Sequence, residues 1–131
     1  MKIAVIGATG TAGARTTSQL KATGADVVEV SRTAGVDLIS GDGLRGALDG
    51  VDVVIDTSNA FPSDDSIDLH DALTAATRHV VEACSSQRVA RLVFLSICGI
   101  ENPVFDDFPY YAAKRAQERI VNDSPVPSTI V

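Results

Sequence analysis

Short apolar runs alternate along the chain with longer stretches in which apolar residues recur every three or four positions. Uninterrupted apolar runs are typical of strands buried on both faces, and the longer spacing is typical of helices that cover a sheet. Strands that alternate with helices predict right-handed crossovers, a parallel sheet and therefore an α/β fold. The predicted strands span 2–6, 27–30, 36–39, 51–55, 91–95 and 129–131, and the predicted helices span 11–23, 44–48, 69–84 and 110–121.

The length and composition support the same fold class. A chain of 131 residues suits one domain. Hydrophobic residues make up 45% of the chain and aromatic residues only 5%, so the core consists mainly of Val, Ile, Leu and Ala. A core of this kind is typical of a parallel sheet between helices. Because the sequence stops within its last predicted strand, we expect residues 1–131 to be the N-terminal part of a longer chain.

The net charge of -6 argues against a nucleic acid or an anionic membrane as partner. It does not argue against a phosphate ligand, because a phosphate needs only a local group of donors. No apolar stretch approaches membrane-spanning length, and the N-terminus is too short for a secretory signal. We therefore expect a cytoplasmic protein.

The cysteines and histidines do not predict a metal centre. Cys84 and Cys98 lie outside any CxxC pattern, which favours reduced thiols over a disulfide or a metal site. His70 and His79 lie nine residues apart on the long predicted helix, which is not the spacing of metal ligands. We expect the histidines at the surface or at an interface, and we expect no metal.

The sequence GATGTAG at residues 7–13 joins the first predicted strand to the first predicted helix. Glycine allows a tight turn and a close approach of the backbone to a ligand. The free N–H groups and the dipole at a helix start favour a pyrophosphate. The alternative is a turn whose glycines serve only strand–helix packing. The predicted dinucleotide-phosphate site consists of Gly7, Thr9, Gly10, Thr11, Ala12 and Gly13.

The end of the second predicted strand indicates which dinucleotide binds. An acidic side chain there would bind the ribose hydroxyls and repel a 2′-phosphate. Ser31 and Arg32 offer a hydroxyl and a guanidinium instead, and Glu29 lies two positions earlier, inside the strand. Both groups suit a phosphate dianion, so we expect NADP(H) to be favoured over NAD(H). The alternative is that Arg32 is a solvated loop residue.

Polar residues also follow the third and fourth predicted strands, at the edge of the sheet where ligands bind in such folds. Asp42 is placed either to reach the adenine or to be an ordinary turn residue. Thr57, Ser58 and Asn59 are placed either to line the site or to serve as turn and cap residues. All four are expected cofactor-binding residues.

Tyr110 and Lys114 lie four residues apart, and therefore on one face of the last predicted helix. A lysine beside a phenol favours the phenolate and lowers its pKa from about 10. The same lysine can bind a ribose hydroxyl. This arrangement suits a tyrosine general acid in carbonyl reduction. The alternatives are a core tyrosine with a surface lysine, or Tyr111 as the exposed ring.

Four segments together resemble the NAD(P)-binding, NmrA-like branch of the atypical and extended short-chain dehydrogenase/reductases. They are residues 7–13, Ser31-Arg32, GVDVV at 50–54 and YYAAKRA at 110–116, so the resemblance covers essentially the whole chain in order. It implies a Rossmann-like, doubly wound parallel sheet in three α/β/α layers, with strand order 3-2-1-4-5-6. It also implies NADP(H) across the strand ends, with Tyr110 and Lys114 near the nicotinamide ribose.

The chain departs from the family pattern after the fifth predicted strand. Extended members place a catalytic Ser or Thr two residues beyond the strand-end serine. Here Ser96 is the strand-end residue and Cys98 occupies the later position. A thiol is a poorer hydrogen-bond donor to a carbonyl than a hydroxyl, which makes Ser96 the candidate catalytic helper. Family members also continue into a C-terminal portion that supplies most of the substrate pocket.

The resemblance implies an NADP(H)-dependent oxidoreductase that transfers hydride between the nicotinamide and a small carbonyl, alcohol or related substrate. Tyr110 would exchange the proton, and Lys114 would tune it and orient the ribose. Cys98 motivates an alternative, a binding module that senses NADP(H) for a protein partner without turnover. A nucleotide-sugar epimerase or dehydratase is a weaker alternative. A homo-oligomer or a protein partner is compatible with these hypotheses.

Overall fold

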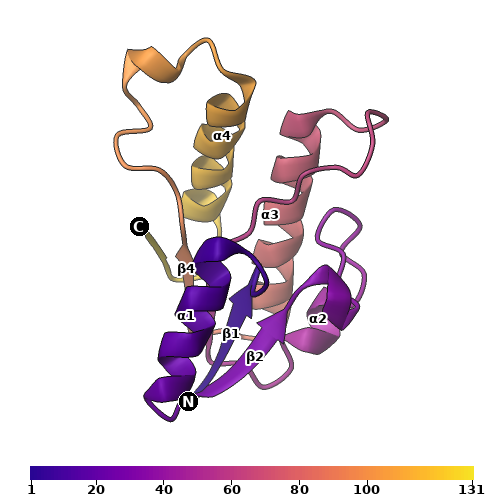
Figure 1. Ribbon diagram of the computed structural model, residues 1–131, viewed down its shortest axis with the longest axis vertical. Helices are drawn as coiled ribbons and strands as arrows, with labels where there is room; N and C mark the ends of the chain where they lie inside the picture. Colours follow the sequence, from indigo (N-terminus) through magenta and orange to yellow (C-terminus); the bar gives the residue numbers. More distant parts are fainter.

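A parallel sheet of five strands forms the centre of the molecule, and the strand order is β2-β1-β3-β4-β5 (Figure 1). The computed structural model describes residues 1–131. The strands are β1 (Lys2–Ile6), β2 (Asp26–Val30), β3 (Val53–Asp56), β4 (Arg91–Phe94) and β5 (Ser128–Ile130). The helices are α1 (Thr11–Ala22), α2 (Leu44–Ala47), α3 (Leu69–Ser86) and α4 (Pro109–Asp123), with the 3-10 turns η1 (Arg32–Ala34) and η2 (Pro103–Phe105).

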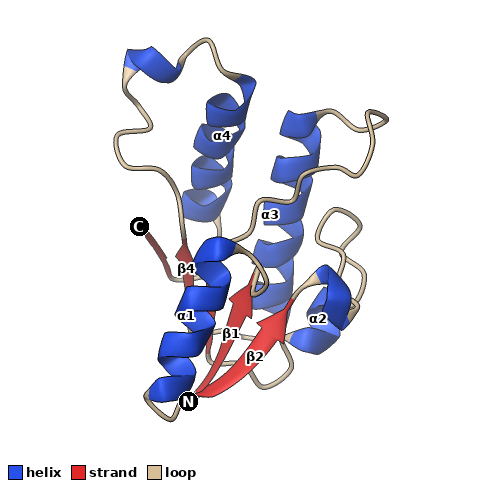
Figure 2. Ribbon diagram, in the orientation of Figure 1, coloured by secondary structure: helices blue, strands red, loops and turns tan.

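The helices lie in two layers, so that the sheet has a helix layer on each face (Figure 2). Helix α1 packs on β1 and β2 from one face, whereas α2, α3 and α4 contact one another in sequence on the other. Right-handed crossovers require this division, because the chain moves from β1 to β2 in one direction along the sheet and from β2 through β3 and β4 to β5 in the opposite direction. No helix is both long enough and apolar enough to cross a membrane.

The core lies between the sheet and the helices and is almost entirely aliphatic. It includes Ile6, Val54 and Leu92 from the strands and Val121 from α4, each at most 1% exposed. Phe94 is the only aromatic residue in this cluster. The composition predicted such a core, and the α/β fold class with a doubly wound parallel sheet is confirmed.

The strands end level with one another, which brings four chain segments to one edge of the sheet. Ile6 pairs with Val30 on one side and with Asp56 on the other. Asp56 in turn pairs with Phe94 of β4. Residues that directly follow β1, β2, β3 and β4 therefore meet at the carboxyl edge, where open α/β sheets bind ligands.

The expected strand at 36–39 is wrong, because this segment forms turns. The carboxylate of Asp37 accepts hydrogen bonds from the backbone N–H groups of Ile39 (2.9 Å) and Ser40 (3.2 Å). Val36 is buried, with 5% of its surface exposed, so its apolar side chain serves the packing of the core and not the pairing of a strand. An aspartate that caps the backbone two and three residues later stabilises a turn in place of an extended strand.

The other five predicted strands and all four predicted helices are confirmed, with ends that shift by at most about two residues. The strand order therefore differs from the expected 3-2-1-4-5-6 by the loss of the third strand alone. Helix α1 ends where Gly24 was expected to stop it, and this glycine has a positive φ of 81°. Glycine at this place relieves the steric cost of a left-handed residue.

Candidate functional site

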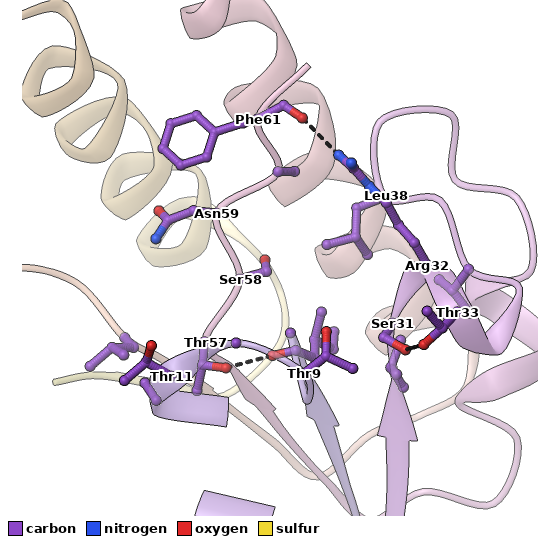
Figure 3. Close-up of a pocket in the computed structure, with 18 of the residues that line it drawn as sticks. Thr9, Thr11, Ser31, Arg32, Thr33, Leu38, Thr57, Ser58, Asn59 and Phe61 are labelled. Atoms are coloured by element: carbon purple, nitrogen blue, oxygen red, sulfur yellow. Dashed lines mark hydrogen bonds between the residues drawn. The ribbon is translucent and has the colours of Figure 1, made fainter. Parts of the chain in front are cut away.

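A cavity of about 580 Å³ lies at the carboxyl edge of the sheet, above the ends of β1, β2 and β3 (Figure 3). Its walls come from the glycine turn, the start of α1, the turn after β2 and the segment after β3. Ten of the expected cofactor-binding residues line it, namely Gly7, Thr9, Gly10, Thr11, Ala12, Ser31, Arg32, Thr57, Ser58 and Asn59. The sequence therefore placed most of the wall correctly.

The glycine turn is set by close contacts of the backbone. Gly7 has a positive φ of 78°, and its N–H donates to the Val30 carbonyl at 3.0 Å. A Cβ added to Gly13 would lie 2.0 Å from the Gly7 carbonyl oxygen and 2.8 Å from the Thr57 hydroxyl oxygen. Gly13 is buried and does not line the cavity. It lets α1 start directly against the turn, and so acts on the site through packing.

The N-terminus of α1 opens into the cavity without a side chain across it. Gly10 is the N-cap residue, no side chain caps the helix, and its first turn carries no acidic residue. Thr11 and Ala12 of this first turn line the cavity. The first N–H groups of a helix have no partner within it, so this end offers donors and a positive dipole to an anion.

The turn after β2 carries two hydroxyls and one cation. The hydroxyl oxygens of Ser31 and Thr33 lie 2.9 Å apart. The guanidinium of Arg32 donates to the Phe61 carbonyl at 2.7 Å (Figure 3). Glu29 forms an exposed ion pair with Lys21 at 2.8 Å and does not line the cavity. No carboxylate pairs with Arg32.

The segment after β3 both supports and lines the cavity. The hydroxyl of Thr57 donates to the Ile6 carbonyl at 2.8 Å and so ties β3 to β1. The hydroxyl and the N–H of Ser58 both donate to Asp56 Oδ1, at 2.6 Å and 2.9 Å. Asn59 is exposed and accepts a hydrogen bond from the Tyr110 hydroxyl at 2.9 Å. The cavity thus reaches α4 through Asn59.

Tyr110 lies among other aromatic rings, at the start of α4. Its ring centroid is 6.0 Å from that of Phe61 and 5.3 Å from that of Tyr111. Tyr111 packs in turn on Phe105 and Phe108, with centroid distances of 4.4 Å and 5.8 Å. Five of the six aromatic residues of the chain therefore form one group, which we call the ring cluster, and only Phe94 lies elsewhere.

The expected lowering of the Tyr110 pKa by Lys114 is wrong. Burial raises the pKa of Tyr110 above its ordinary value. Lys114 has other partners than the phenol: its Nζ donates to the Leu95 carbonyl at 3.2 Å and lies 4.6 Å from the centre of the Phe94 ring. The i,i+4 spacing put both residues on one helical face, but the lysine stem follows the sheet instead of the helix surface.

Lys114 and Asp56 are two buried groups of opposite charge beneath the cavity, each 2% exposed. Burial lowers the pKa of Lys114, and the carboxylate of Asp56 opposes this shift. Burial raises the pKa of Asp56, while its hydrogen bonds from Ser58 and the charge of Lys114 oppose that rise. Each charge therefore makes the burial of the other less costly.

Five expected residues lie away from the cavity lining, and one of them is Tyr110, whose link to the wall is its hydrogen bond to Asn59. Asp42 is exposed in a turn, where its carbonyl accepts a hydrogen bond from the Asp37 N–H at 3.0 Å. The hydroxyl oxygen of Ser96 is buried and has no hydrogen-bond partner. Lys114 and Gly13 support the site from below. Because none of the five lines the cavity, each can act on a ligand only through its neighbours or after a movement.

The cysteines and histidines also lie outside the cavity. Cys84 is buried and Cys98 exposed, and both are free thiols, as the lack of a CxxC pattern predicted. Burial raises the pKa of the Cys84 thiol to about 12. Nδ1 of His79 lies 2.9 Å from the Leu38 carbonyl oxygen, so this histidine joins α3 to the turns after η1. His70 is exposed.

A protein-family model described as NAD(P)H-binding matches residues 7–131, which include the whole glycine turn and all the residues that line the cavity except Ile6. The chain belongs to this NAD(P)H-binding family. The expected NAD(P)-binding, Rossmann-type character is thereby confirmed. No curated protein sequence matches the chain significantly.

Solved structures share the fold of this member of the NAD(P)H-binding family. A short-chain dehydrogenase/reductase superfamily protein from Agrobacterium tumefaciens with bound NAD has 24% identity and a TM-score of 0.75, over 99% of this chain and 48% of that one. An oxidoreductase from Lactococcus lactis has 20% identity and a TM-score of 0.75, over 99% and 67%. UDP-N-acetylglucosamine 4-epimerase from Bacillus cereus has 21% identity and a TM-score of 0.77, over 99% and 58%. The chain spans about half to two thirds of the length of these proteins.

Several cavity residues of this NAD(P)H-binding chain were not expected from the sequence. Thr33 follows Arg32 directly, and its hydroxyl was available as a signal beside Ser31. Phe61 is the only aromatic residue of the segment after β3, a signal that its loop position obscured. Val36, Leu38 and Ile39 were assigned to a strand, which concealed their place in the wall. The remaining unexpected lining residues are Ile6, Val30, Ala60 and Leu95.

Proposed function

We propose that the chain forms the cofactor half of an NADP(H)-dependent oxidoreductase of the short-chain dehydrogenase/reductase type. The observation that carries this proposal is the continuity of one cavity from the glycine turn to Asn59, whose side chain accepts the hydrogen bond of Tyr110. When bound, the nicotinamide supplies or accepts hydride. The protein's own residues bind the two phosphates, select the ribose and hold a proton at the Tyr110 hydroxyl.

The glycine turn fits a pyrophosphate. Free N–H groups at the start of α1 face the cavity, and Gly10 leaves room for an anion, since the only atom near an added Cβ would be the Gly7 carbonyl oxygen at 3.4 Å. The hydroxyls of Thr9 and Thr11 line the same wall and can add donors. Neutral donors at a positive helix end bind such a group even in a chain of net charge -6.

The turn after β2 supports a preference for NADP(H). Ser31 and Thr33 bring two hydroxyls within 2.9 Å of each other, and Arg32 adds a cation that no carboxylate neutralises. A 2′-phosphate can accept from all three. Glu29, the acid closest to the strand end, is engaged by Lys21 and so does not repel it. Asp42 keeps only the role of a turn residue in this proposal.

Tyr110 is the proposed proton donor in the direction of reduction. Its raised pKa keeps the phenol protonated at neutral pH, which suits an acid more than a base. Asn59 can serve both protonation states, because its amide oxygen accepts from the phenol and its amide N–H₂ can donate to a phenolate. Lys114 contributes through Leu95, whose carbonyl it holds and whose side chain lines the cavity floor.

The ring cluster favours a small carbonyl or alcohol over a nucleotide sugar as the substrate. Phe61, which packs on Tyr110, is 49% exposed, and Phe108, which packs on Tyr111, is 54% exposed, so both offer apolar faces. A sugar would need several hydrogen-bonding groups around the same phenol. One observation favours the alternative of a sensing module without turnover: neither the buried Ser96 hydroxyl nor the exposed Cys98 thiol reaches the cavity as a helper for Tyr110.

Steady-state oxidation of NADPH with a panel of small carbonyl compounds and quinones tests this proposal. The oxidoreductase hypothesis predicts turnover that a Tyr110→Phe substitution removes while NADPH affinity is kept. Tight NADPH binding with no turnover over the panel would favour the sensing module. Turnover that is unchanged in the Tyr110→Phe variant would refute the role of the phenol.

A further inference from the structure

The side chain of Arg32 spans the mouth of the cofactor cavity and hydrogen-bonds to a loop 29 residues away in sequence. Its Nη2 donates to the Phe61 carbonyl at 2.7 Å, a distance typical of a charge-assisted hydrogen bond (Figure 3). Arg32 also lines a second, smaller cavity of about 250 Å³ with Pro62, Asp64 and Ile67. The guanidinium is therefore part of the wall between two cavities.

Little else holds this loop. Residues 57–68 between β3 and α3 contain neither strand nor helix. Within 60–67 the remaining hydrogen bonds are local: the Phe61 N–H donates to the Asn59 carbonyl, and the Ser66 N–H donates to Asp64 Oδ1. The bond from Arg32 is the only hydrogen bond between residues 60–67 and a distant part of the chain. Its loss therefore leaves packing contacts alone to hold the middle of the loop.

The held loop positions the proposed acid. The Phe61 ring lies 6.0 Å from the Tyr110 ring, and Asn59, two residues before Phe61, accepts the Tyr110 hydrogen bond at 2.9 Å. A displacement of the loop at Phe61 thus moves both a ring neighbour and the hydrogen-bond acceptor of the phenol. Arg32, Phe61 and Tyr110 form a continuous set of contacts from the β2 end to α4.

We propose that Arg32 is a positioning residue that couples recognition of the cofactor's 2′-phosphate to the placement of Phe61 and Tyr110. A guanidinium has five N–H donors in one plane. It can therefore donate to the Phe61 carbonyl from one edge and to a phosphate from another. A phosphate that fixes the guanidinium also fixes the loop. By thermodynamic reciprocity, the hydrogen bond between Arg32 and the Phe61 carbonyl raises the affinity for the 2′-phosphate. This inference rests on the proposed NADP(H) function.

Hydrogen exchange of the loop amides, read by mass spectrometry, tests the coupling in the full chain. In the absence of cofactor, Arg32→Ala speeds exchange of residues 60–67 by about tenfold, the effect expected from the loss of one charge-assisted hydrogen bond. Saturating NADPH protects these amides more than saturating NADH does, and Arg32→Ala removes the difference. Arg45→Ala is the matched control, since it removes an exposed arginine of α2 whose side chain has no partner.

Calorimetric titration with both dinucleotides gives the second readout. Arg32→Ala reduces the ratio of NADPH to NADH affinity by about tenfold or more. Arg32→Lys keeps part of that ratio but not the extra loop protection, because an ammonium is a point charge that cannot serve two acceptors in fixed directions. A structural defect alone would not separate these two quantities.

The outcomes separate the coupling from the function on which it rests. If NADPH and NADH both bind but protect residues 60–67 equally, or if Arg32→Ala leaves loop exchange unchanged, the coupling is refuted and the cofactor site stands. If the Arg32→Lys variant shows the full extra protection of residues 60–67 by NADPH, a positive charge alone suffices. The proposed simultaneous contact of the guanidinium with the Phe61 carbonyl and the phosphate is then refuted. If neither dinucleotide binds, the proposed function fails and the coupling fails with it.

Discussion

The two ends of the cofactor cavity are built in different ways. At the glycine end, residues of the glycine turn form the wall, and their backbone packs so closely that an added Cβ at the buried Gly13 would lie 2.0 Å from the Gly7 carbonyl oxygen. At the ring end, side chains form the wall: Asn59 and Phe61 line the cavity from a loop, and Tyr110 of α4 donates a hydrogen bond to Asn59. The first end is fixed by steric contact and the second by a few hydrogen bonds and ring contacts.

This difference separates binding from selectivity. A backbone wall with free N–H groups accepts any pyrophosphate, so the glycine end suits a whole family of dinucleotide proteins. Arg32, which is joined to the ring end through the Phe61 carbonyl, distinguishes phosphates, and Asn59 and Tyr110 hold a proton. These side chains therefore set which cofactor binds and which reaction follows. Substitutions at the glycine end should therefore abolish binding, and those at the ring end should change its consequences.

The largest expected effect is at the glycine end. Gly13→Ala pushes a methyl group into the Gly7 carbonyl and the Thr57 hydroxyl, and we expect it to lower NADPH affinity by about 100-fold or more and the free energy of unfolding by about 2–4 kcal/mol. Calorimetry and urea unfolding measure the two quantities. Gly46→Ala is the matched control, because no atom lies within 4 Å of its added Cβ, and we expect it to bind normally. Equal behaviour of the two variants would show that close packing at Gly13 is not required.

The next effect separates the two adjacent tyrosines of the ring end. Tyr110→Phe removes the hydroxyl that donates to Asn59, and we expect turnover to fall by about 100-fold or more with little change in NADPH affinity. Tyr111→Phe keeps the ring that packs on Phe105 and Phe108, so its turnover should stay close to that of the parent. Steady-state kinetics with one substrate compares them. A larger loss of turnover in Tyr111→Phe than in Tyr110→Phe would make Tyr111 the proton donor.

The pKa of Tyr110 can be measured directly, because the chain has two tyrosines and no tryptophan. In a Tyr111→Phe variant, the absorbance of the phenolate reports Tyr110 alone. Burial raises this pKa, so we expect ionisation at a pH above the ordinary value of about 10. Titration below that value would restore the original expectation of a lysine-stabilised phenolate and would place Lys114 beside the ring.

A smaller effect comes from the buried Asp56 beneath both ends. Burial raises its pKa above 3.8, so the folded chain binds this proton more tightly than the unfolded chain does. The free energy of unfolding therefore falls as pH rises from 3.8 through the pKa of Asp56 in the folded chain. The Asp56→Asn variant has no carboxyl at this position and does not show this fall. Urea unfolding at acid and neutral pH should show that the free energy of unfolding of the variant rises relative to that of the parent toward neutral pH. If the difference in free energy of unfolding between Asp56→Asn and the parent does not change with pH, the raised pKa of Asp56 is contradicted.

The smallest effect concerns the two thiols. Cys98 is exposed and Cys84 is buried, with burial raising the pKa of Cys84 to about 12. A thiol reagent should therefore label one cysteine per folded chain and both after unfolding. Because the unfolded Cys84 ionises first, the free energy of unfolding also falls as pH rises from 9.0 toward 12. Rapid labelling of both thiols in the folded chain would place Cys84 outside the core.

The same contrast explains what the sequence could predict. Glycine spacing and apolar runs are local, so the turn at 7–13, the helices and five of the six expected strands were placed correctly. The segment 36–39 failed because Asp37 forms a turn through its own side chain. The contact of Arg32 with Phe61 and the direction of Lys114 arise between segments far apart in sequence, which periodicity does not specify.

The central claim is that this cavity holds NADP(H) with the pyrophosphate at the glycine turn and the 2′-phosphate at Ser31, Arg32 and Thr33. A side-by-side calorimetric titration of the parent chain with NADPH and NADH tests it most directly. We expect one site per chain for both, with NADPH bound more tightly by about tenfold or more. Equal affinities would contradict the phosphate site, and the absence of binding by either dinucleotide would contradict the account as a whole.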